Sequence, residues 1–134
     1  MSFGRHCFHH QYIRQTFVKR NLAKGAHFIV GDEFLPNHVL TNKEERADAL
    51  LRYHGHIINK AKSENHPVLV QLENEALEAG LKDQGDFKLS CDQYEEYLSK
   101  AGLRFANPTK IGPQKPQNVG GIYVYSINLP ANSD

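Results

Sequence analysis

The sequence predicts an α+β fold, a single-domain, ferredoxin-like β-α-β-β-α-β sandwich with an added N-terminal helix. Three observations support this class. The chain has 134 residues, 40% of them hydrophobic and 23% charged, which suits one soluble domain over residues 1–134. Apolar residues recur at helical intervals in some segments and alternate in others. Without the first helix, the order of these segments is the split β-α-β pattern.

The first predicted elements are a helix over 10–24 and a strand over 26–34. Ile13 and Phe17 lie four residues apart on one face of the helix, and Gly25 follows as a stop signal. The strand is rich in apolar residues, and Pro36 ends it.

A helix over 42–63 has the clearest pattern. Thr41 is its expected N-cap, because Glu44 follows three residues later at the capping-box spacing. The apolar face of this helix is formed by residues at helical intervals, namely Ala47, Leu50, Leu51, His54, Ile57, Ile58 and Ala61. We therefore expect His54 in the buried stripe and His56 toward solvent.

Two short strands and a helix are expected next. A proline opens a strand over 68–72, and a third strand is expected over 86–90. The helix that follows can be capped by Ser90 or Asp92, and it ends at Gly102.

The C-terminal part of the chain is expected to be a loop and a strand. Residues 107–121 are rich in Pro, Gly, Gln and Asn, which predicts one long surface loop. Residues 121–129 alternate, so Tyr125 and Ile127 should share one face of the last strand with Tyr123.

Charge is strongly segregated along the chain. The first 31 residues have five bases and no acid, residues 32–96 have fourteen acids against seven bases, and the rest has four bases and one acid. Cations interleaved with aromatic rings suit a polyanion with stackable bases. We therefore expect binding of nucleic acid or another polyanion. The residues expected to make the contacts are Arg5, Phe8, Tyr12, Arg14, Lys19, Arg20, Lys24, Lys110 and Lys115.

Composition also bears on location. No apolar run approaches the ~18 residues of a membrane span, so we expect no membrane partner. No segment resembles a signal peptide. Cys7 and Cys91 are too few for a disulfide framework, and free thiols fit a reducing, cytoplasmic location.

Two clusters contain residues that can bind metals. One groups His6, Cys7, His9 and His10, but neighbours this close cannot all reach one ion, so a basic surface segment is the simpler interpretation. The other contains Glu73, Glu75 and Glu78. On a continued strand Glu73 and Glu75 would share a face and could hold a metal, whereas three carboxylates on a solvated turn are the commoner case.

A further pair of motifs is His54-Gly55-His56 and, later, Tyr97-Leu98-Ser99-Lys100. On a strand the two histidines would share a face, whereas on a helix they would lie about 200° apart. A tyrosine with a lysine three residues later can attack a phosphodiester and offset the developing charge.

In this order, and with the strand-like phrase FIVGDE over 28–33 before them, these motifs resemble the second and third motifs of HUH-type replication initiators of small circular DNA replicons. The resemblance implies a nickase of single-stranded DNA. His54 and His56 would bind Mg²⁺ or Mn²⁺, Tyr97 would be the nucleophile and Lys100 would assist it.

Two further alternatives are open. His27, the run NHVLT over 37–41 and His54 resemble part of the metal site of homing-type HNH nucleases, in which a first histidine activates water. In the other alternative the protein is a non-enzymatic regulatory or interaction module that uses its acidic middle to engage a basic partner.

Overall fold

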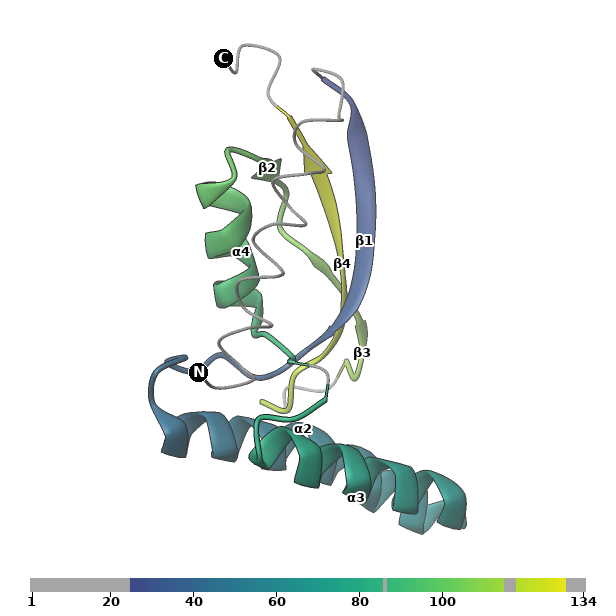
Figure 1. Cartoon of the computed structure of the whole chain (residues 1–134). Helices are drawn as coiled ribbons and strands as arrows, with labels where there is room; N and C mark the ends of the chain where they lie inside the picture. Colours follow the sequence, from purple (N-terminus) through teal and green to yellow (C-terminus); the bar gives the residue numbers. More distant parts are fainter. Residues whose placement is uncertain (1–24, 86, 115–117, 130–134) are drawn as a thin grey trace.

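The described part of the chain is an antiparallel sheet with one helix against its face and a pair of helices at one end (Figure 1). This computed structural model describes residues 25–85, 87–114 and 118–129. The predicted helix over 10–24 lies outside the described residues. The α+β class is confirmed, because helices and a four-stranded sheet are both present.

The sheet is built around β4, Gly121–Asn128, which pairs along its full length with β1, His27–Phe34. The other side of β4 pairs with β2, Arg104–Phe105, and with β3, Thr109–Gly112. The strands predicted over 26–34 and 121–129 are therefore confirmed. The expectation of one long loop over 107–121 is wrong in part, because β3 lies inside it.

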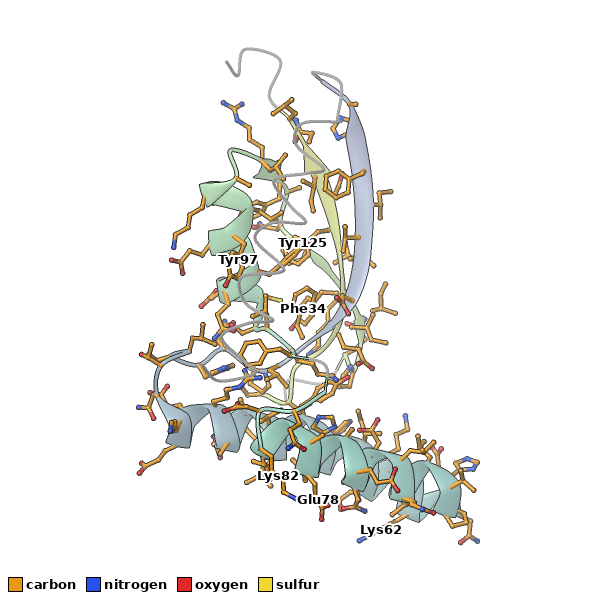
Figure 2. The ribbon with its side chains drawn as sticks, in the orientation of Figure 1. Phe34, Lys62, Glu78, Lys82, Tyr97 and Tyr125 are labelled. Carbon is orange, nitrogen blue, oxygen red and sulfur yellow. The ribbon has the colours of Figure 1, made fainter. Side chains whose placement is uncertain are left out.

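Alternation along β4 sets the position of the main core. Tyr125 and Ile127 are fully buried, whereas Ile122 on the opposite face is 45% exposed, which confirms the predicted faces. The rings of Phe34 and Tyr94 pack within 5.6 Å of the Tyr125 ring, measured between centroids. Figure 2 shows Phe34, Tyr97 and Tyr125 in the space between α4, Cys91–Lys100, and the sheet.

The predicted helix over 42–63 is confirmed as α2, Lys43–Ser63. Its N-cap is Asn42 and not Thr41, because the Asn42 side chain accepts hydrogen bonds from the backbone N–H groups of Glu44 and Glu45, each at 3.1 Å. The buried face includes Leu50 and His54, as the periodicity predicts, whereas the expectation that Leu51 belongs to this face is wrong, because its side chain is 51% exposed.

The predicted strand over 68–72 is wrong, because these residues lie in α3, Pro67–Leu81. A proline at the first helical position favours this outcome, and the run of Glu, Ala and Leu that follows favours a helix. A five-residue apolar run fits a strand or a helix equally well, so packing against α2 decides. As a result, the ferredoxin-like topology is not confirmed.

The third predicted strand, over 86–90, is also not formed. Only one bridge is present in the described part of this segment, between Ser90 and Leu35, where the Leu35 N–H donates to the Leu89 carbonyl oxygen at 2.9 Å. The next helix, α4, is confirmed, and Ser90 caps it in a reciprocal capping box with Gln93.

The two helices α2 and α3 form an antiparallel pair that we call the helical hairpin. Leu50 of α2 packs closely on Gly80 of α3, where an added Cβ would lie 3.0 Å from a Leu50 methyl group. Ala49, Leu50 and Tyr53 join Leu35 in a second, smaller core at the foot of the sheet. Across the described ranges, no helix is both long and apolar enough to cross a bilayer.

Candidate functional site

The two histidines of the predicted metal pair lie on α2, not on a strand. Residues two apart on a helix point about 200° apart, so the shared face required for joint metal binding is not formed. The His54 side chain is 3% exposed, and its Nδ1 lies 2.7 Å from Oε2 of Glu73 on α3. Within the described residues there is no group of three or more His, Cys, Asp or Glu side chains that could hold a metal ion.

The predicted nucleophile lies in a different part of the molecule. Tyr97 is on α4, where it is 4% exposed and belongs to the main core. Burial, with the nearby Glu96 carboxylate, raises the pKa of Tyr97, which disfavours the phenolate that an attack would require. Lys100 is exposed and pairs with Glu96 at 3.0 Å. The structure therefore corrects the expected grouping, because the two histidines lie on α2, whereas Tyr97 lies on α4 in the main core.

The three glutamates expected on a turn or strand lie on α3. Glu73 bonds to His54, while Glu75 and Glu78 are exposed. The helix separates Glu73 from Glu75 by about 200°, so these carboxylates do not share a face. The basis for a metal held by this pair is thereby removed.

Most residues of the predicted polyanion site lie outside the described residues, namely Arg5, Phe8, Tyr12, Arg14, Lys19, Arg20, Lys24 and Lys115. The cluster His6, Cys7, His9 and His10 also lies outside them. Lys110 is described on β3, where it is half-buried and its Nζ is 5.6 Å from the centroid of the Tyr123 ring. That distance is within the range of a cation–π contact.

A hydrogen-bond network around His38 joins the loop after β1 to both α2 and α4. The His38 Nδ1–H donates to the Pro36 carbonyl oxygen at 2.9 Å. This leaves Nε2 as the acceptor for the Gln93 amide at 3.2 Å and Nη1 of Arg46 at 3.4 Å, so the tautomer is assigned from its partners. Nη1 of Arg46 also donates to the Lys88 carbonyl oxygen at 3.1 Å.

This network was not predicted from the sequence. Apart from the local His38–Pro36 bond, its partners lie 8 to 55 residues apart, so no local spacing signals it. In the motif that resembles HNH nucleases, the network gives His38 a structural role. Both of its ring nitrogens already have hydrogen-bond partners. A pocket of about 250 Å³ lies beside it, with Gln93, Tyr97 and Lys100 among its lining residues.

The His38 network predicts a pH-dependent stability. Burial lowers the pKa of His38 below its ordinary value of 6.5, and the Arg46 charge lowers it further, against the raising effects of the Pro36 carbonyl and Glu45. Because the unfolded chain then binds the proton more readily, the free energy of unfolding should fall as the pH drops from 6.5 through the folded pKa. Chemical denaturation at a series of pH values would measure this slope.

The matched comparison is between His38→Gln and His27→Gln. The first should flatten the slope, whereas His27 is exposed on β1 and its replacement should leave the slope unchanged. Equal slopes in the wild type and His38→Gln would contradict the assignment.

A larger cavity of about 400 Å³ lies in the corner between the helical hairpin and the sheet, and we call it the junction pocket. α2 and its C-cap residue Glu64 line it with residues spaced one helical turn apart, beginning at Tyr53, and Leu69 of α3 forms another wall. The remaining side is closed by Glu33, by the C-terminal end of β3 and by the N-terminal end of β4.

One residue that lines the junction pocket is Glu33, whose carboxylate has charged and polar neighbours. Burial raises the pKa of Tyr53, and so does the nearby Glu33 carboxylate. The Glu33 carboxylate also lies 3.7 Å from Nζ of Lys88.

Gly120 has φ 76°, and a Cβ there would overlap the Phe34 carbonyl oxygen, so only glycine lets β4 begin this close to the end of β1.

Comparisons of the chain with protein-family models, with curated proteins and with solved structures found no match. The functional argument therefore depends on the residues themselves. Two features carry it, which are the charge distribution along the chain and the junction pocket.

Proposed function

We propose that this protein binds nucleic acid or another polyanion through its basic, aromatic-containing N-terminal segment, residues 1–31. The observation that carries this proposal is the charge pattern, in which five bases and no acid precede Asp32. Clustered cations lower the free energy of a bound phosphate backbone by releasing its counterions. Aromatic rings between them offer stacking surfaces for unpaired bases.

The position at which this segment joins the described fold supports the proposal. Gly25 precedes the start of β1, and the eight residues of β1 separate that point from the helical hairpin (Figure 1). At about 3.3 Å per residue, that is far beyond the ~8–10 Å over which exposed charges interact at physiological salt. The register also places Arg104 beside Asn128, which pairs with His27, so a further cation lies at this end of the sheet.

One acidic element, α3, lies at the opposite end of the sheet (Figure 1). α3 carries Glu73, Glu75 and Glu78 and no base. A polyanion at the start of β1 would therefore not face the acidic helix.

A titration of the full chain against fluorescent single-stranded DNA, RNA and heparin tests the proposal. We expect binding at low salt, with an affinity that falls steeply as salt rises. Mn²⁺ should have no specific effect. Absence of binding at low salt, or binding that salt does not change, would overturn the proposal. Polylysine in the same titration would detect the alternative of an interaction module that engages a basic partner through its acids.

The nickase alternative makes a separate prediction about Tyr97. Because its ring is buried and its pKa is raised, we expect no covalent adduct when the protein meets single-stranded DNA and Mn²⁺. A denaturing gel with labelled oligonucleotide measures this. Tyr94→Phe is the matched control for Tyr97→Phe, since both rings are buried on α4. An adduct lost only in Tyr97→Phe would establish the enzyme.

A further inference from the structure

We propose that the junction pocket binds a small amphipathic carboxylate, whose apolar body lies in the pocket and whose carboxylate meets Lys60 and His56. The pocket is separate from the N-terminal segment, so this inference does not depend on polyanion binding. It is based on the shape of the cavity, the chemistry of its walls and the pairing of its charged side chains.

The walls of the pocket suit an apolar body. The apolar side chains come from three places in the fold, Ile57 and Ala61 on α2, Leu69 on α3, and Val119 and Ile122 beside the sheet. Leu69 is 40% exposed and Ile122 is 45% exposed, so both have apolar area that a ligand would cover. The volume, about 400 Å³, is in the range of small-ligand sites, which is roughly 300–1,000 Å³.

The charged side chains at the pocket differ in whether they have partners. Each of its two carboxylates lies near a basic side chain: Glu33 is 3.7 Å from Nζ of Lys88, and Oε2 of Glu64 is 3.8 Å from Nε2 of His66. Lys60 and His56 also line the pocket. In the ranges that the structure describes, neither side chain makes a hydrogen bond or an ion pair.

The two unengaged groups lie close enough to act together. His56 and Lys60 are four residues apart on α2, so they are neighbours on one face of the helix. An imidazole N–H and an ammonium group are both hydrogen-bond donors to oxygen. The pocket therefore combines apolar walls with two hydrogen-bond donors, His56 and Lys60, that have no acceptor among the described side chains.

A singly charged carboxylate fits this arrangement better than a phosphate does. The pocket already contains the Glu33 and Glu64 carboxylates, and α2 ends at Ser63, so the negative end of its helix dipole is near. A second negative charge on the ligand would increase the repulsion from all three. A cationic head group would be attracted by the two carboxylates, but each of these already lies near a basic side chain, whereas Lys60 and His56 would be left without an acceptor.

Three probes with the same alkyl chain and different head groups test the proposal on the full chain. These are decanoate, decanol and decyltrimethylammonium, each used below its aggregation concentration. Backbone amide NMR shifts should saturate with decanoate and centre on Glu33, Lys60, Leu69 and Ile122. Decanol should bind more weakly and the cation most weakly. Equal binding of all three, or no saturable shift at these residues, would overturn the proposal.

A pair of variants shows whether Lys60 recognises the head group. Lys60→Glu should weaken decanoate binding at least about fivefold and leave decanol binding nearly unchanged. Lys62→Glu is the matched control, because Lys62 is exposed on the same helix and does not line the pocket. Equal effects of the two changes on decanoate would refute a role for Lys60.

A third variant tests the apolar wall. Leu69→Asp should weaken decanoate and decanol alike, and thermal melting should confirm that the change leaves the protein folded, since Leu69 is partly exposed. Unchanged binding in a folded Leu69→Asp protein would place the ligand elsewhere and overturn the proposal.

Discussion

Reversing Arg14, Lys19 and Arg20 to Glu should weaken binding of single-stranded DNA at least about tenfold at moderate salt. Each lost cation no longer displaces a counterion from the phosphate backbone, and each new carboxylate repels it. The slope of log affinity against log salt should fall by about 2, because each contact to a single strand contributes about 0.7. Fluorescence anisotropy over a salt series measures both quantities.

The matched control reverses three exposed cations elsewhere, Lys43, Lys62 and Lys82. These lie on or next to the helical hairpin, and the change in net charge is the same. If the N-terminal segment is the binding site, this control should retain most of the affinity and nearly all of the salt slope. Equal losses in the two triple variants would mean that binding follows net charge alone, which would contradict a defined site.

Local signals predicted several elements of the fold correctly. Ser90 and Gln93 form the capping box at α4 because the exchange of hydrogen bonds needs only residues three apart. Alternation along β4 predicted which side chains reach the core, because successive residues of any strand point to opposite faces. Such patterns lie within one element, so the sequence displays them directly.

The errors occurred where distant contacts decide. Residues 68–72 are helical because α3 packs along α2, through Gly80 on Leu50 and Glu73 on His54. β3 exists because four residues between two prolines pair with β4, and its own sequence shows mainly loop signals. No spacing rule would have found either contact.

The candidate site follows the same division. The stripe of α2 residues that lines the junction pocket has a regular helical spacing, so its α2 wall was visible in the sequence as part of an amphipathic helix. The other walls come from α3 and from the ends of the strands, which only the tertiary structure brings there. The sequence predicts His56 as half of a metal pair. In the fold it lies instead at the junction pocket, one helical turn from Lys60.

Replacing His54 with Leu should lower the free energy of unfolding by about 2 kcal/mol, because it leaves the Glu73 carboxylate without its hydrogen-bond partner. From the sequence alone, a leucine in this apolar stripe looks harmless. The structure shows, however, that the His54 imidazole is bonded at 2.7 Å to Glu73, whose side chain is only 19% exposed. Without the imidazole, that carboxylate loses its partner and regains little water. Denaturant unfolding of the two proteins measures the difference.

A double-mutant cycle separates the pair from its surroundings. His54→Leu with Glu73→Leu replaces both polar groups by apolar ones, so the double variant should be more stable than His54→Leu alone, with a coupling of about 1–2 kcal/mol. Glu75→Leu, two residues along the exposed face of α3, should change stability by less than about 0.5 kcal/mol. Additive effects of His54→Leu and Glu73→Leu would show that the contact between the two side chains contributes nothing, and that α2 and α3 associate through their apolar residues alone.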